Sequence, residues 1–165
     1  MNYRNKTYVC FDADEDIHYY RLLTALKAKD GKEFNFHNAH DVFQMQKNKI
    51  AINNEKYIKE KLQQRLLNTK CFIILVGNKT KNLYKYVRWE IETALLLDLP
   101  IIVINLNNTS SIDYKFCPPI VREKLAVHIP YKKEAIKRAL NNWPDEYRKL
   151  KKENIEGPRH YKDLL

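Results

Sequence analysis

The chain has 165 residues and a formal net charge of +10, with 44% hydrophobic and 30% charged residues. These proportions exclude a wholly disordered or collagen-like chain, and the length suits one domain rather than two. A basic surface attracts polyanions. Here the lysines and arginines alternate with acids on predicted helix surfaces, so we interpret most of this charge as a solvated face, with functional anion binding as the alternative.

The opening residues MNYRNKTYVCF lack the long apolar stretch and the cleavage site of a secretory signal, which favours a cytoplasmic protein. The most apolar run, ALLLDLPIIVINL, is too short to cross a bilayer and is interrupted by Asp98 and Pro100. We therefore expect no contact with a membrane. Cys10, Cys71 and Cys117 are widely spaced, so we expect neither a disulfide framework nor a zinc site.

The first third of the chain predicts a strand, a helix and a second strand. Residues 7–11 (TYVCF) are aromatic and β-branched, which favours a buried strand. Apolar residues then recur at helical spacing from Ile17 to Leu26, and Gly31 supplies a stop signal. Residues 33–37 (EFNFH) alternate as a strand does. Residues 38–53 show no clear period, and a loop of this length is often functional.

The remainder alternates in the same way. Residues 71–77 (CFIILVG) are almost continuously apolar, which is typical of a strand covered on both faces, and we expect this to be the central strand. Around it the pattern predicts, in chain order, a helix over 55–69, a helix over 83–98, a strand over 100–106, a short helix and a final edge strand within 120–130, and a last helix over 131–143 that Pro144 ends.

This alternation predicts a single α/β domain of the flavodoxin-like type, a three-layer sandwich in which helices cover both faces of a mainly parallel, five-stranded sheet. We place the domain at residues 1–143 and expect residues 144–165 to form a C-terminal extension that packs on the domain or on a partner. Ligands of such sheets bind beyond the carboxyl ends of the strands. The loops after Phe11, Phe36 and Gly77 would therefore border any site.

Several enzyme classes are excluded by missing motifs. The chain contains only Gly31, Gly77 and Gly157, so neither a GxGxxG turn nor a GxxxxGK[ST] loop can be formed, which excludes Rossmann dehydrogenases and P-loop nucleotide hydrolases. The HExxH and GxSxG patterns are also absent, which excludes zincins and α/β-hydrolases.

An acidic cluster, FDADED, directly follows the first predicted strand. It would suit a divalent cation, as in phosphoreceiver domains of the same fold. A receiver also needs an aspartate at the end of the central strand, where this chain has Gly77. We therefore favour capping of the first helix by Asp14, Glu15 and Asp16. For Asp12, nearest the strand end, capping and a place in the ligand cleft both remain open.

Trp89 and Glu90 do not fit the amphipathic pattern of their predicted helix. At about 100° per residue, Val87, Ile91 and Ala94 form the stripe that packs on the sheet. Glu90 falls on the margin of that stripe, where a carboxylate can reach a cleft; a solvated surface glutamate is the alternative. Trp89 projects to the opposite side, which indicates that an overlying segment or another subunit covers it.

Two segments resemble a known family. KTYVCFDADEDIHYYRLL and KCFIILVGNKTKNLYKYVRWEIETALLLDLPIIVINL are similar, in order and spacing, to the TIR-like domains typified by the bacterial Thoeris anti-phage TIR proteins. The resemblance covers roughly the first two-thirds of the chain. It implies a TIR-like fold and an enzyme that cleaves NAD, with Glu90 as the essential carboxylate. NAD would be the substrate, and neither a cofactor nor a metal ion would be needed.

The resemblance also implies residues that flank the nucleotide: Cys10, Phe11, Asp12, Asp41, Phe43, Gly77 and Tyr86. Two of these depart from the family pattern, because Cys10 stands where a serine is common and Tyr86 where a tryptophan is common. Core packing is the alternative for the two phenylalanines. Thoeris-like members make a nucleotide signal, cyclic or linear, that activates a separate effector protein, and we expect a homo-oligomer.

The sequence also allows two other functions. In a non-catalytic interaction module, Trp89 and the basic helices would dock a partner and Glu90 would be structural. Nucleic-acid binding rests on charge alone, because the chain has no basic run interleaved with aromatic residues at a recognised spacing. We therefore expect no nucleic-acid partner.

Overall fold

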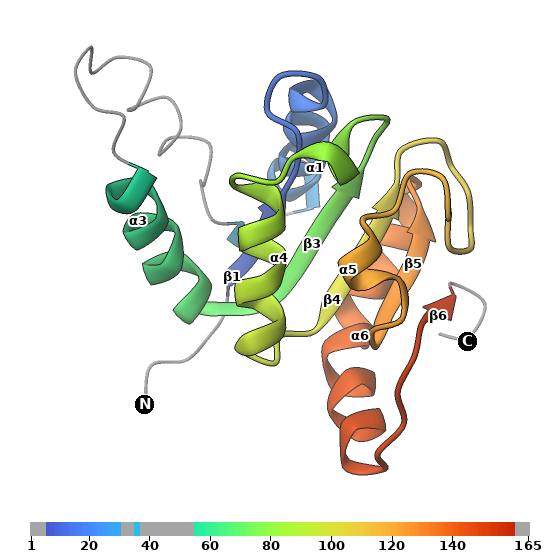
Figure 1. The fold of residues 1–165 in the computed structure, drawn as a ribbon. Helices are drawn as coiled ribbons and strands as arrows, with labels where there is room; N and C mark the ends of the chain where they lie inside the picture. Colours follow the sequence, from blue (N-terminus) through green and yellow to red (C-terminus); the bar gives the residue numbers. More distant parts are fainter. Residues whose placement is uncertain (1–5, 31–34, 37–54, 161–165) are drawn as a thin grey trace.

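A computed structural model of the protein describes residues 6–30, 35–36 and 55–160. Over these residues, six strands form one parallel sheet in the order β2-β1-β3-β4-β5-β6 (Figure 1). The strands are β1 (Lys6–Cys10), β2 (Asn35–Phe36), β3 (Thr69–Val76), β4 (Ile101–Asn105), β5 (Ala126–Pro130) and β6 (Arg159–His160). The predicted flavodoxin-like α/β fold is confirmed, and the two-residue β6 extends the sheet by one strand beyond the five expected.

Helices cover both faces of the sheet, which makes three layers (Figure 1). One face carries α3 (Glu55–Leu67), α4 (Val87–Leu96) and the short α5 (Pro119–Arg122), and the other carries α1 (Ile17–Asp30) and α6 (Lys133–Lys152). Alternation along β1 decides which side chains meet which layer. Tyr8 and Cys10 point into the core under α3 and α4, whereas Val9 and Phe11 point into the core under α1 and α6.

β3 is the inner strand that the continuous apolar run predicts. It pairs with β1 on one side and with β4 on the other, and every residue from Cys71 to Val76 is buried. The connection from β1 through α1 leads to β2, whereas the connection from β3 through α4 leads to β4 in the opposite direction. The carboxyl ends of β1 and β3 therefore form the point where the winding reverses, the usual ligand position in such sheets.

α6 is longer than the sequence predicts. The expected end at Pro144 is wrong, because α6 continues to Lys152 with Pro144 inside it. Proline removes one backbone hydrogen bond from a helix, but the apolar stripe continues through Trp143, Tyr147 and Leu150, all of which are buried against the sheet. That burial offsets the missing hydrogen bond. The predicted domain boundary between residues 143 and 144 lies within this helix.

α4 is shorter than the sequence predicts. A 3-10 turn, η1 (Thr80–Asn82), follows β3, and α4 begins only at Val87 rather than near Leu83. Thr80 holds this connection in place, because its hydroxyl accepts a hydrogen bond from the Gly77 N–H at 2.9 Å and donates to the Leu75 carbonyl at 3.3 Å. The late start places Glu90 in the first turn of α4.

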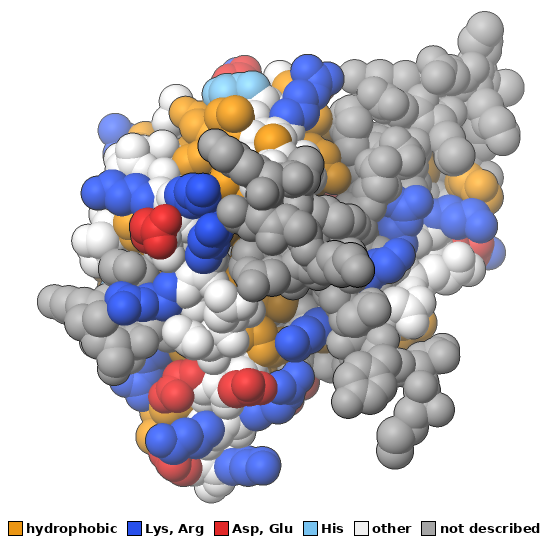
Figure 2. Space-filling view, turned by 180° about the vertical axis from the view of Figure 1, so that it is seen from behind, with side chains coloured by type: hydrophobic (Ala, Val, Ile, Leu, Met, Phe, Trp, Pro, Cys, Tyr) orange, Lys and Arg blue, Asp and Glu red, His pale blue; other side chains and the backbone are white. Residues whose placement is uncertain are grey.

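On the face that Figure 2 shows, lysines and arginines are spread out rather than gathered in one patch. Figure 2 shows basic and acidic side chains next to one another around the end of α6. Two of these contacts are ion pairs, Arg148 with Asp145 and Lys151 with Asp98. Among the described helices, none is long and apolar enough to cross a membrane.

The packing of α6 predicts that its last turns stabilise the domain. Leu150 is 7% exposed, so Leu150→Ala should lower the free energy of unfolding by about 2–5 kcal/mol. The neighbouring Lys149→Ala, on the exposed side of the helix, should change it by less than about 0.5 kcal/mol. Urea unfolding followed by circular dichroism measures both. Equal effects of the two substitutions would contradict the packing of residues 144–152 on the sheet.

Candidate functional site

Glu90 is buried between α4 and β1. Its side chain is 3% exposed, although the helical pattern placed it only at the margin of the packed stripe. The Tyr8 hydroxyl donates a hydrogen bond of 2.6 Å to Glu90 Oε2, and Tyr8 is itself completely buried. A buried carboxyl group needs such a partner, because an unpaired polar group away from water costs free energy. This hydrogen bond therefore anchors the start of α4 to β1.

Cys10 lies beside the same carboxyl group. It is two residues after Tyr8 on β1 and shares its face of the sheet. The Cys10 thiol donates to the Val87 carbonyl at 3.9 Å. Burial, the charge of Glu90 and a hydrogen bond to Glu90 together raise the pKa of the Cys10 thiol well above its usual value. Cys10 is therefore a neutral donor next to Glu90 and not a reactive thiolate.

The burial of Glu90 makes it a weak acid. Burial, opposed in part by Tyr8 and Cys10, raises the pKa of the Glu90 carboxyl group to about 8. The pKa of the Tyr8 hydroxyl is also raised, first by burial and second by the charge of Glu90. At neutral pH the carboxyl group is therefore mostly protonated, and a nearby positive charge would favour its ionisation.

The acidic cluster lies at the carboxyl end of β1. Asp12 is buried, and its Oδ1 accepts hydrogen bonds from the Asp14 N–H at 3.0 Å and the Glu15 N–H at 3.4 Å. Asp12 thus stabilises the turn before α1. Glu15 forms an ion pair with Lys79 at 2.6 Å. Capping of α1 by Asp14, Glu15 and Asp16 stays a prediction. Among the described residues, no three ligands are grouped to hold a metal ion.

The Asp16 side chain packs against Gly77. Its carboxylate lies so close to the Gly77 Cα that a Cβ at this position would collide with both carboxylate oxygens. A larger residue at this position would require the Asp16 side chain to shift. Burial, followed by the charge of Asp12, raises the pKa of the Asp16 carboxyl group to about 6.

The other predicted nucleotide contacts are separated in space. Phe11 is stacked on Tyr20 with ring centroids 4.6 Å apart, on the opposite face of the sheet from Glu90. Tyr86 immediately precedes α4, packs in part against the core under that helix, and accepts the Glu90 N–H at its carbonyl at 2.8 Å. Asp41 and Phe43 lie outside the described residues. The structure therefore groups Cys10, Tyr86 and Glu90, but not Phe11, around the start of α4.

Trp89 is covered in part by a helix, where the sequence predicts an overlying segment or subunit. Lys59 of α3 lies over its ring, with Nζ 5.6 Å from the centroid. An open hollow of about 560 Å³ remains between α3 and this indole, lined by Glu55, Lys56, Lys59, Glu60, Gln63 and Trp89. Part of the expected cover is thus supplied within the chain.

Tyr8 is the residue of the site that sequence reasoning missed. Its signal was present: in a strand, residues two apart face the same way, so a role for Cys10 implied that Tyr8 lies on the same face. The partner of Tyr8 is 82 residues away in sequence, and no periodicity connects the two. Only the pairing of β1 with β3, followed by α4, brings them together.

A parallel flavodoxin-like sheet, with a buried glutamate in the first turn of the helix after its central strand, is the arrangement expected of a TIR-like domain. The chain belongs to the family described as "Thoeris protein ThsB, TIR-like domain", whose family model matches residues 8–111. The match contains Tyr8, Cys10, the acidic turn and Glu90, and extends past the end of β4.

The raised pKa of Glu90 predicts a pH-dependent penalty to stability. The ordinary carboxyl pKa is 4.5 and the folded value is about 8. Between these values the unfolded chain releases the proton and the folded chain keeps it, so stability falls as the pH rises. Glu90→Gln keeps an acceptor for Tyr8 but cannot ionise. Relative to Glu90→Gln, the wild type should lose on the order of 3 kcal/mol of unfolding free energy between about pH 5 and pH 8.

Urea unfolding at the two pH values measures this difference. Glu92→Gln is the matched control, because Glu92 is on the same helix, is half exposed and pairs with Arg88. Its free energy should follow the wild type at both pH values. A wild type that loses no stability relative to Glu90→Gln over this range would show that Glu90 is not buried as described.

Proposed function

We propose that the protein cleaves the bond between nicotinamide and ribose in NAD, with Glu90 as the catalytic carboxylate. The observation that carries the proposal is a buried glutamate, held by Tyr8, in the part of the chain that matches the Thoeris TIR-like family. Its position near the carboxyl ends of β1 and β3 is the usual ligand position in this fold.

The chemistry requires one carboxylate. When the bond between the ring nitrogen and ribose C1′ breaks, nicotinamide leaves with the bonding electron pair as a neutral molecule. The sugar carbon becomes positively charged, as in glycoside cleavage. An ionised carboxylate next to this carbon stabilises the charge, and the effect is strongest where water is excluded. Water as acceptor gives ADP-ribose and a proton, whereas an atom of the same molecule gives a cyclic product.

The substrate supplies a positive charge next to Glu90. The nicotinamide ring of NAD is positively charged, so its binding favours the ionised form of Glu90. Tyr8 donates to the carboxyl group, and both Tyr8 and the neighbouring Cys10 favour the same form. Glu90 is 3% exposed, so a substrate reaches it only when the side chains that cover it move aside. The structure thus supports a carboxylate whose ionisation is coupled to substrate binding.

The remaining parts of the proposal rest on the family. We propose that the product is a nucleotide signal that activates a separate effector in anti-phage defence, and that the protein acts as a cytoplasmic homo-oligomer. A non-catalytic interaction module is the second candidate, favoured by the hollow beside the half-buried Trp89.

The first test is nicotinamide release. Wild type, Glu90→Gln and Glu92→Gln are incubated with NAD, alone and with lysate from virus-infected cells, because a defence enzyme can require a trigger. We expect release by the wild type and by Glu92→Gln, and a decrease of at least about 100-fold in Glu90→Gln, since it removes the charge that stabilises the transition state. Circular dichroism checks that each variant is folded. A wild type that releases no nicotinamide in either condition would favour the interaction module.

The second test is the pH dependence of the reaction. Because the carboxyl group must be ionised and burial raises its pKa to about 8, kcat/KM should increase with pH up to roughly that value. Tyr8→Phe removes a hydrogen bond to the ionised form, so its profile should shift to higher pH. Tyr19→Phe, a tyrosine on the opposite face of the sheet, should leave the profile in place. Superimposable wild-type and Tyr8→Phe profiles would refute the role of Tyr8.

A further inference from the structure

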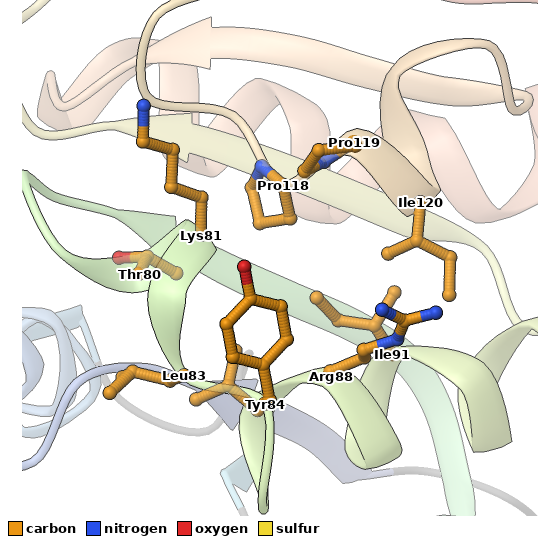
Figure 3. A pocket seen from close by; sticks show the side chains of 10 residues that line it. Thr80, Lys81, Leu83, Tyr84, Arg88, Ile91, Pro118, Pro119 and Ile120 are labelled. Carbon is orange, nitrogen blue, oxygen red and sulfur yellow. The ribbon is translucent and has the colours of Figure 1, made fainter.

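A second cavity opens on the other side of α4, between this helix and α5 (Figure 3). Its volume is about 430 Å³, within the range of roughly 300–1,000 Å³ typical of small-molecule sites. Val87 and Ile91 of α4, both buried, form an apolar base. Pro118, Pro119 and Ile120, at the start of α5, form the facing wall.

Positively charged and aromatic side chains border this cavity. Lys81 and Arg88 lie on either side of Tyr84, whose hydroxyl end points toward Pro118 (Figure 3). Lys81 Nζ donates to the Lys115 carbonyl at 2.6 Å, which is an uncharged acceptor and leaves the positive charge in place. Arg88 uses only its Nε for Glu92, at 2.9 Å in an exposed pair, so its terminal nitrogens still have donors. Among the residues that the structure describes, no acidic one lines the cavity.

This cavity is distinct from the surroundings of Glu90. At 100° per residue, Arg88 and Glu90 point to nearly opposite sides of α4. Glu90 faces Tyr8 on β1, whereas Arg88 and Ile91 face α5. A molecule in this cavity would contact Val87 and Ile91, the residues that flank Glu90 on the packed stripe, without contacting Glu90 itself.

We propose that the cavity between α4 and α5 binds a nucleoside monophosphate. The planar base can stack on the Tyr84 ring beside the apolar wall of the cavity, because aromatic surfaces stack on bases of any sequence. The phosphate fits Arg88 or Lys81, because a guanidinium or ammonium group pairs with phosphate through charge-assisted hydrogen bonds. A base without a phosphate, or a phosphate without a base, would use only half of the site. The proposal does not depend on NAD cleavage by Glu90.

The test is titration with AMP, followed by calorimetry and by amide chemical shifts. We expect saturable binding to the wild type with a Kd at or below about 1 mM, and binding of adenosine or inorganic phosphate alone at least about tenfold weaker. Arg88→Ala and Tyr84→Ala should each weaken AMP binding about tenfold or more. Both side chains are exposed, so these variants should fold. Lys85→Ala, an exposed lysine nearby that does not line the cavity, should bind as the wild type does.

Two further variants separate this site from the proposed catalytic site. Ile120→Trp places a larger side chain in the cavity and should abolish AMP binding, whereas Glu90→Gln should bind AMP as the wild type does. The proposal is overturned if the wild type shows no saturable AMP binding up to about 10 mM, or if Arg88→Ala and Tyr84→Ala bind as Lys85→Ala does. It is also overturned if Glu90→Gln loses AMP binding while Arg88→Ala keeps it, because the nucleotide would then lie at Glu90.

Discussion

The hydrogen bond from Tyr8 to Glu90 is the constraint on which the site depends. It joins the first strand to the helix that follows the central strand, with donor and acceptor both buried. Because Tyr8 donates, Glu90 keeps a partner in either protonation state. The strand fixes the position of the hydroxyl, and the late start of α4 fixes that of the carboxyl group. The contact therefore depends both on where α4 begins and on how the strands are arranged in the sheet.

The same burial has opposite effects on stability and on chemistry. An ionised carboxylate away from water is unfavourable in the free protein, which is why the pKa of Glu90 is raised to about 8. Next to a developing positive charge, that low-polarity environment strengthens the attraction. A surface glutamate would have a weaker effect, because water would screen its charge. On the opposite side of α4, the cavity beside Arg88 gives this helix a second surface suited to a small molecule.

The sequence predicts those parts of the fold that depend on local pattern. The apolar runs at residues 71–77 and 100–106 correspond to β3 and β4. A strand that is buried on both faces consists almost entirely of apolar residues, so it can be recognised from the sequence. The end of α6 is not predicted correctly from Pro144. The rule that proline ends a helix does not take tertiary packing into account, and the burial of Trp143 and Leu150 stabilises the longer helix. Glu90 is found from its position in the helix and from family resemblance. Tyr8 is not, because its contact spans 82 residues.

The most direct test is a carbon-13 NMR titration of the Glu90 side-chain carboxyl group, with and without NAD, assigned by comparison with Glu90→Gln. The account predicts a pKa of about 8 in the free protein, and a lower value when the positively charged nicotinamide ring is bound. A carboxyl group that titrates near 4.5, its ordinary value, and that does not respond to NAD would contradict both the buried site and its proposed chemistry.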